Sequence, residues 1–134
     1  MSEENVKVVR AATEAAVAGD GATALNALDP KIEWHGTIGG LDEGRIARGH
    51  EAVAKEFAEY FQSWEGIELR VDRYIDAGDE EVVVFIHEIA KGRASGIVVE
   101  TDVATVHTVR DGKIVRARSF LDREEALEAV GLRE

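Results

Sequence analysis

The sequence contains no cysteine, a single proline and few aromatic residues, and acidic residues outnumber basic ones. Without cysteine there is no disulfide, no thiolate metal site and no catalytic thiol. Sixteen lysine and arginine residues stand against 27 acidic ones, which gives a net charge of −11. No stretch combines basic residues with aromatics. Nucleic acid and anionic membranes are therefore not expected as partners, because their phosphates would repel this chain.

Long apolar runs are also missing. No segment approaches the roughly 20 apolar residues that span a membrane. The acidic start of the chain, Met1 to Asn5, predicts a helix rather than a signal peptide. We therefore expect a cytoplasmic protein. The 134 residues are 45% hydrophobic and 32% charged, which suits one globular domain over 1–134.

The spacing of apolar residues predicts helices in the first half and strands in the second. The expected order is α-α-β-α-β-β-β-β-α. The only proline, Pro30, is expected to close the second helix. Asp122 with Glu125 forms a capping box for the last helix, which Gly131 ends. The expected elements are helices before Gly19 and from Gly21 to Pro30, a strand at 32–35, a helix at 50–64, strands at 67–76, 82–89, 97–109 and 114–121, and a helix at 123–130.

The two longest β-branched segments form a hairpin over 97–121. Asp111-Gly112 predicts a two-residue turn that pairs Val109 with Ile114. The face expected to point inward is mostly small and apolar, and it carries Asp102, Ala104, Val106, Val115, Ala117, Ser119 and Leu121. An extra bulge residue would exchange the faces and place His107 inside in place of Asp102. Both registers remain open at this point.

Several short motifs, taken in their order, resemble the SnoaL-like group of the nuclear transport factor 2-like superfamily. The resemblance covers nearly the whole chain. It implies an α+β cone, a half-barrel in which a curved, mostly antiparallel sheet wraps around three N-terminal helices, with a short C-terminal helix. The motifs are Ala18-Gly19-Asp20, Leu28-Asp29-Pro30-Lys31-Ile32-Glu33-Trp34-His35, Arg48-Gly49-His50-Glu51-Ala52-Val53, Asp76-Ala77-Gly78-Asp79, Arg110-Asp111-Gly112-Lys113-Ile114, and Asp122 to Leu127 with Gly131-Leu132.

The same resemblance implies a pocket more than a particular reaction. Ala12 stands where ketosteroid isomerases have a tyrosine, and Val106 stands near their oxyanion-hole aspartate. Their general-base aspartate falls near His35 or Gly36. Ser119 corresponds to the final-strand aspartate of SnoaL-type cyclases and epoxide hydrolases. None of these catalytic sets is complete.

His35 and Asp102 are the candidate catalytic residues. His35 ends the first strand at the expected mouth of the cone, where an imidazole could accept a proton or orient a water. It could instead be a rim residue bonded to a loop carbonyl. Asp102 is the one acid on the expected inner face, where desolvation would raise its pKa. It could instead cap a backbone group or pair with an arginine.

The candidate substrate-binding residues come from the aromatic stripe of the third helix, the first strand and the hairpin. This stripe is expected to form core and pocket wall together. His87 and Glu88 are neighbours on a strand, so only one of them faces inward. The candidate set is Trp34, Phe57, Tyr60, Phe61, Trp64, Val106 and Ser119.

Two further features bear on the site. The four histidines show no ligand spacing, so no metal is expected. The glycine-rich segment Gly36 to Gly49 predicts a mobile flap over the mouth rather than a phosphate loop.

Two functions of different classes fit these observations. One is a cofactor-independent isomerase or cyclase that moves a proton on a small, largely apolar molecule. The other is a non-catalytic ligand-binding or dimerisation module that has lost the catalytic acids of the family. A homodimer is expected through the outer face of the sheet, because that face would expose too much apolar surface. The residues assigned to it are Val103, Thr105, His107, Ile114, Arg116, Arg118 and Phe120.

Overall fold

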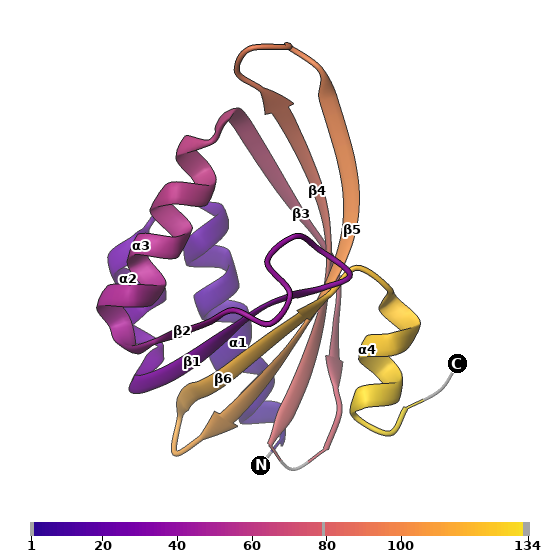
Figure 1. Ribbon diagram of the computed structural model, residues 1–134. Coiled ribbons are helices and arrows are strands. Elements are labelled where there is room, and N and C mark those ends of the chain that lie inside the picture. Colours follow the sequence, from indigo (N-terminus) through magenta and orange to yellow (C-terminus); the bar gives the residue numbers. More distant parts are fainter. Residues whose placement is uncertain (1, 79, 133–134) are drawn as a thin grey trace.

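A strongly curved sheet with helices on its concave side dominates the computed structural model, which describes residues 2–78 and 80–132 (Figure 1). The predicted α+β half-barrel is confirmed. None of the helices in these ranges is long and apolar enough to cross a membrane. The elements are α1 (Ser2–Val17), α2 (Gly21–Asn26), β1 (Leu28–Ile38), β2 (Ile46–Arg48), α3 (Gly49–Gln62), β3 (Trp64–Asp76), β4 (Glu81–Gly92), β5 (Val98–Arg110), β6 (Lys113–Phe120) and α4 (Arg123–Ala129).

The strands of the second half form the predicted antiparallel meander. The sheet order is β2-β1-β6-β5-β4-β3, so β3 to β6 are consecutive neighbours. β1 joins the meander through a parallel pairing with β6, and β2 extends the sheet beside β1. The strand β2 lies in a segment that we expected to be a loop. Pro30 sits inside β1, where the pairing with β6 shifts between Leu28 and Glu33 and so tolerates a missing N–H.

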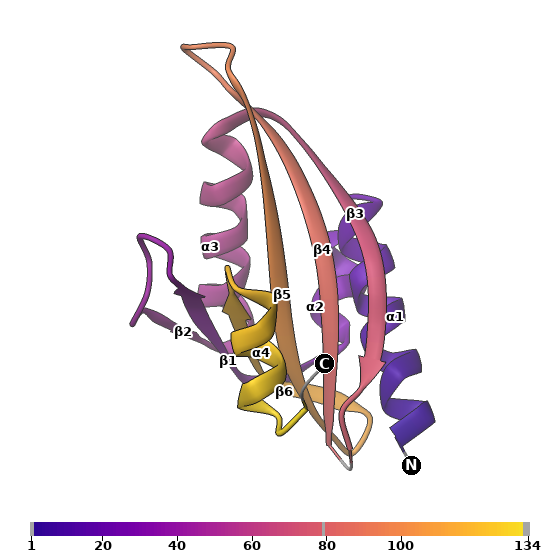
Figure 2. The same cartoon turned by 90° about the vertical axis from the view of Figure 1, so that its right-hand side faces the viewer.

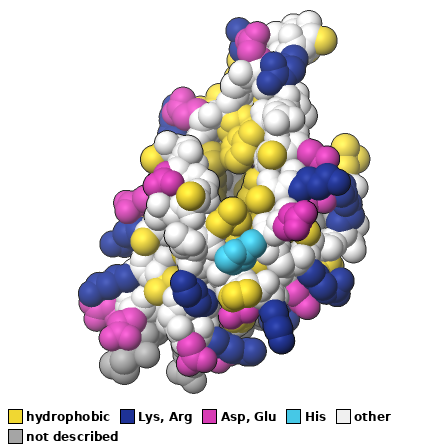
Figure 3. Space-filling view, turned by 90° about the vertical axis from the view of Figure 1, so that its left-hand side faces the viewer, with side chains coloured by type: hydrophobic (Ala, Val, Ile, Leu, Met, Phe, Trp, Pro, Cys, Tyr) yellow, Lys and Arg dark blue, Asp and Glu magenta, His cyan; other side chains and the backbone are white. Residues whose placement is uncertain are grey.

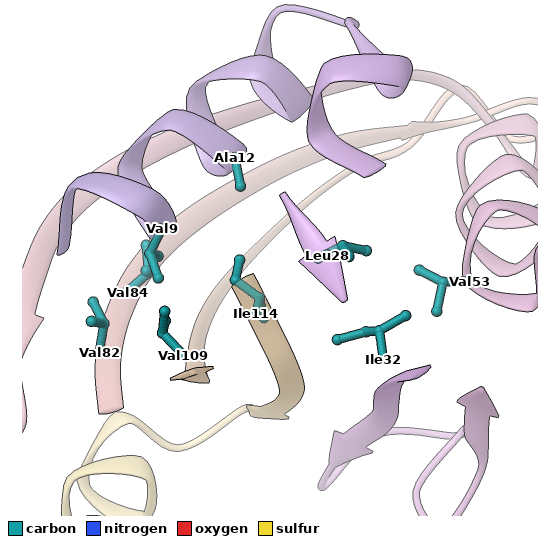
Figure 4. Close-up of a cluster of buried hydrophobic side chains, with 9 residues drawn as sticks. All are labelled: Val9, Ala12, Leu28, Ile32, Val53, Val82, Val84, Val109 and Ile114. Carbon is teal, nitrogen blue, oxygen red and sulfur yellow. The ribbon is translucent and has the colours of Figure 1, made fainter. Parts of the chain in front are cut away.

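The core has one layer on each side of the sheet. On the concave side, Val9 and Ala12 of α1 point toward Val84 and Ile114 of the sheet (Figure 4). On the convex side, the short helix α4 packs Ala126 and Leu127 against the strands. Figure 2 looks onto this convex face, with α4 in front of the strands. The two layers give the sheet a helix-covered inner face and a second covered patch behind it.

The β5–β6 hairpin turns where the sequence predicts but then slips by one residue. Asp111 and Gly112 have φ values of 51° and 74°, as a two-residue turn of this kind requires, and Val109 pairs with Ile114. Thr108 then pairs with Arg116, so Val115 is an extra residue. Beyond this bulge His107 stands opposite Ala117, and the faces of β5 are exchanged.

The predicted inner face of the hairpin is therefore wrong for β5. Ala104 and Val106 pack under α4 on the convex side, and Asp102 shares their face. His107 takes the inner position, which is the alternative that a bulge predicts. In β6, Ser119 keeps its inward direction, because its hydroxyl lies 3.3 Å from that of Thr105.

The outer face on which we based a homodimer is also assigned wrongly. Thr105, His107 and Ile114 point inward, and Phe120 is only 5% exposed because α4 covers it. Helix α4 is capped by Asp122, which accepts hydrogen bonds from the N–H groups of Glu124 and Glu125, and Arg123 links it to Asp72 of β3 at 2.7 Å. The homodimer stays a prediction, but the exposed apolar surface that motivated it is covered in this structure.

Candidate functional site

A cavity of ≈380 Å³ lies between the three N-terminal helices and the concave face of the sheet. Figure 3 shows the helix side of the molecule, where apolar side chains surround a central hollow. Val17 and Phe61 line the cavity and remain 44% and 41% exposed, so it opens to the surface beside them. The lining residues are Ala12, Thr13, Ala16, Val17, Gly19, Gly21, Ala24, Leu25, Leu28, Trp34, Ala54, Phe57, Ala58, Phe61, Leu69, Ile86, Thr105, His107 and Ile114.

The lining is almost entirely apolar. Its polar side chains are Thr13, Thr105, His107 and the indole of Trp34. Among the described residues that line the cavity, His107 is the one titratable group, and no carboxylate or basic side chain joins it. The cavity thus suits an apolar molecule and offers few hydrogen bonds to orient it.

His107 is the polar centre of the cavity. Its side chain is only 5% exposed, and its Nδ1 makes no hydrogen bond with any described residue. Burial lowers the pKa of His107 to about 4, so the imidazole is neutral at pH 7. The Trp34 ring stands edge-on to it at a centroid distance of 5.9 Å. A neutral imidazole has one N–H donor and one nitrogen acceptor, which suits an uncharged polar group.

Three of the predicted substrate-binding residues line the cavity: Trp34, Phe57 and Phe61. Trp34 and Phe57 meet edge to face, with ring centroids 4.7 Å apart. Their place follows from the helical spacing of α3 and from the alternation of β1, which turns Trp34 toward the helices.

The other members of that set do not line it. Tyr60 donates a hydrogen bond of 2.6 Å to Glu88 Oε1, and Trp64 packs beside Tyr60 with a centroid distance of 6.5 Å. Burial, and then the hydrogen bond to Glu88, raise the pKa of Tyr60. Ser119 pairs with Thr105 across the β5–β6 ladder but is not among the lining residues, and Val106 faces α4 because of the bulge.

His35 and Asp102 are not among the lining residues either. His35 follows Trp34 in β1 and so faces the opposite side, where its Nε2 lies 3.3 Å from Glu33 Oε1. Asp102 Oδ1 lies 2.8 Å from His87 Nδ1, and its side chain is 55% exposed. This hydrogen bond lowers the pKa of Asp102, whereas the sequence led us to expect a rise. Neither residue therefore belongs to this cavity.

His87 and Glu88, which are neighbours on β4, point to opposite sides of the sheet. His87 lies on the convex side, bonded through Nδ1 to Asp102 and through Nε2 to Glu100 at 2.7 Å. The first of these bonds, and then the second, raise the pKa of His87. Glu88 points the other way and meets Tyr60 of α3.

The glycine-rich segment between β1 and β2 is a closed turn away from the cavity. Asp42 Oδ1 accepts a hydrogen bond from the N–H of Thr37, and Glu43 Oε1 accepts one from Gly39. A Cβ at Gly36 would lie 1.9 Å from the carbonyl oxygen of Asp42, so only glycine fits there. The described residues of this segment do not line the cavity, so it does not form the predicted flap over the mouth. No group of three or more metal-ligating side chains is found in the described part of the chain.

Comparisons with known proteins agree with this architecture. Residues 9–117 match the family model of the SnoaL-like domain. TerC, crystallised with polyporic acid, is 22% identical, with a TM-score of 0.76 over 95% of this chain and 98% of its own. A putative SnoaL-like polyketide cyclase from Jannaschia sp. CCS1 is 18% identical, with a TM-score of 0.76 over 98% and 94%. Rv0760c from Mycobacterium tuberculosis, in complex with estradiol-17β-hemisuccinate, is 15% identical, with a TM-score of 0.72 over 87% and 92%. No curated protein matches the sequence.

Proposed function

The chain belongs to the SnoaL-like domain family, and we propose that it binds a small, largely apolar molecule in the cavity, with His107 as the polar anchor. The observation that carries this proposal is the chemistry of the lining, which joins apolar walls to a single neutral imidazole. Two structural neighbours were crystallised with small organic ligands, which supports the same use of the fold.

The apolar walls supply the affinity. Each 100 Å² of apolar ligand surface removed from water contributes about 2.5 kcal/mol before the cost of association is subtracted. The walls come from helices and strands of one packed domain, so the cavity exists without the ligand. A preformed cavity lowers the ordering cost of binding.

His107 supplies selectivity. Its buried Nδ1 has no partner among the described residues, and an unsatisfied buried polar group costs roughly 1–3 kcal/mol. A ligand hydroxyl or carbonyl in the cavity would give the imidazole a hydrogen bond through its cavity-facing edge. We therefore expect a ligand with one uncharged oxygen at the His107 end to bind better than the matching hydrocarbon.

Calorimetric titration of a panel of apolar ring compounds, each with at least one hydroxyl or carbonyl group and estradiol among them, tests the proposal. Ala58→Phe places a ring in the cavity, and Ala11→Phe makes the same change on the exposed face of α1. Binding to the wild-type protein and to Ala11→Phe, with loss in Ala58→Phe, is the expected result. If no compound binds, or if Ala58→Phe binds as well as the wild type, the proposal is wrong.

Proton transfer of the isomerase or cyclase type is the second candidate function, and it is favoured by the presence of the His107 imidazole in the cavity lining. A base with a pKa of about 4 accepts a proton weakly at pH 7, and the described residues that line the cavity include no carboxylate to assist it. Binding is therefore the function that this geometry supports best. Turnover of a β,γ-unsaturated ketone, followed by the absorbance of its conjugated product, would separate the two. Activity that His107→Gln abolishes and Asp102→Asn leaves unchanged would favour the enzyme.

A further inference from the structure

Glu88 stands at the edge of the cavity, at the end remote from His107. It lies two residues beyond Ile86 on the same face of β4, and it pairs directly with Leu69 of β3. Both Ile86 and Leu69 line the cavity. Side chains directly opposite each other on neighbouring strands have Cβ atoms about 5 Å apart. The carboxylate of Glu88 is thus the next group that a ligand would meet beyond these two walls.

The carboxylate of Glu88 keeps free hydrogen-bonding capacity. Its one hydrogen bond among the described residues comes from the Tyr60 hydroxyl, at 2.6 Å, which ties α3 to β4. An ionised carboxylate has about four acceptor positions. One phenol therefore leaves room for a donor group of the ligand.

The lysine and arginine side chains described near this end of the cavity lie outside its lining and bind other partners. Lys91 and Arg93 belong to the same hairpin, but Lys91 Nζ lies 2.9 Å from Glu65, and Arg93 Nε donates to the carbonyl oxygen of Gln62. Among the described residues, the cavity lining itself holds no basic side chain. A ligand carboxylate inside the cavity would have no lysine or arginine of the described lining as a counter-charge, and it would face Glu88, which makes its burial costly.

From this arrangement we infer that the ligand is neutral or cationic, and that Glu88 binds a hydrogen-bond donor, best a protonated amine, at the end opposite His107. The inference deepens the proposed function and rests on it. In the β4–β5 pairing His107 lies opposite Val82, and Glu88 lies opposite Thr101. His107 and Thr101 are six residues apart on β5. This is roughly 20 Å of strand, from which the reach of both side chains is subtracted. A skeleton of a few linked rings fits such a span.

Two structural neighbours were crystallised with polyporic acid and estradiol-17β-hemisuccinate, but these ligands do not set the charge preference of the present cavity. Those proteins are 22% and 15% identical to this chain, a likeness that extends to the fold. The charge of a ligand is selected by the side chains at the two ends of the cavity. In this chain these are a neutral histidine and a glutamate.

Three biphenyl probes test the inference by calorimetry. All carry the same para-hydroxyl group at one end, and the other end bears an aminomethyl, a hydroxymethyl or a carboxymethyl group. Glu88→Gln removes the charge but keeps an oxygen acceptor for Tyr60. Glu128→Gln is the matched control, because it removes one charge on the exposed side of α4, behind the sheet.

The wild-type protein and Glu128→Gln should bind the amine probe most tightly and the carboxylate probe most weakly. In Glu88→Gln the amine probe should lose roughly tenfold in affinity, as expected for one charge-assisted hydrogen bond, while the hydroxymethyl probe changes less than about twofold. Binding of the hydroxymethyl probe without an amine preference, or an amine preference that survives Glu88→Gln, would overturn this inference and leave the proposed function standing. Failure of all three probes to bind the wild type would count against both.

Discussion

Acid should destabilise this protein through His107, and the size of the effect follows from its burial. The pKa of His107 falls from its ordinary value of 6.5 to about 4 in the folded protein. Between these two values the unfolded chain binds a proton that the folded one does not. The free energy of unfolding therefore falls as the pH drops through this window, and it is fully retained above pH 6.5.

The magnitude can be worked out for pH 5. That pH lies about 1.5 units below the unfolded pKa, and each unit is worth about 1.4 kcal/mol, so His107 costs the folded state about 2 kcal/mol relative to pH 7. The side chain is 5% exposed, so screening by solvent does not reduce the figure much. His107→Gln has no such proton and should lose about 2 kcal/mol less than the wild type between pH 7 and pH 5.

Urea unfolding followed by circular dichroism, at both pH values and for both proteins, measures this double difference. Other titrating groups are common to the two proteins and cancel, provided that the m-values agree. A double difference below about 0.5 kcal/mol would refute the reasoning, because the pKa of His107 would then be nearly the same in the folded and the unfolded protein.

Other substitutions test the fold and the two faces of the sheet. Ile114→Ala removes a fully buried side chain shared by core and cavity, and it should cost roughly 2–5 kcal/mol in urea unfolding. Gly112→Ala forces a φ of 74° on alanine and should cost about 1 kcal/mol, whereas a neutral result would argue against the tight turn. Asp102→Asn should lower the pKa of His87, read by NMR titration, because it weakens the bond that raises this pKa. The same variant should bind the ligand within about twofold of the wild type, since Asp102 lies outside the cavity lining, and a tenfold loss would contradict its placement.

The sequence predicts the meander, the helices and the terminal cap of α4, because each rests on local chemistry. The Asp111-Gly112 pair requires a turn, and Asp122 with Gly131 marks the two ends of the last helix. These signals act over a few residues and need no tertiary contact. The family resemblance supplies the curvature of the sheet, which no local pattern predicts.

The site is harder to predict, because it depends on one extra residue. Val115 bulges out of the β5–β6 pairing, and this slip alone exchanges Asp102 for His107 on the inner face. The alternation of apolar and polar residues along β5 is compatible with either register. A histidine among valines and threonines is the one local signal that could have favoured the observed register. That register buries His107 and exposes Asp102, whereas the other register would bury the carboxylate of Asp102 at a high cost.

The apolar outer face was misassigned for a related reason. Phe120 and Val106 are apolar because α4 covers them, and the sequence alone does not say where a short amphipathic helix docks. Tyr60 and Trp64 belong to the aromatic stripe of α3, but they lie where Glu88 meets the helix rather than in the cavity lining. Helical spacing fixes the face of a helix, while the extent of a cavity along it depends on the opposite strand.

The most direct test of ligand binding at His107 is an NMR titration of the histidine rings. The protein, labelled with ¹⁵N in its four histidines, is titrated with the tightest-binding member of the hydroxyl and carbonyl panel. The ring nitrogens of His107 should shift on binding, while those of His35, His50 and His87 stay in place, because only His107 lines the cavity in the described structure. A ligand that binds without moving His107, or that moves His35 or His87 in its place, would contradict the proposed site.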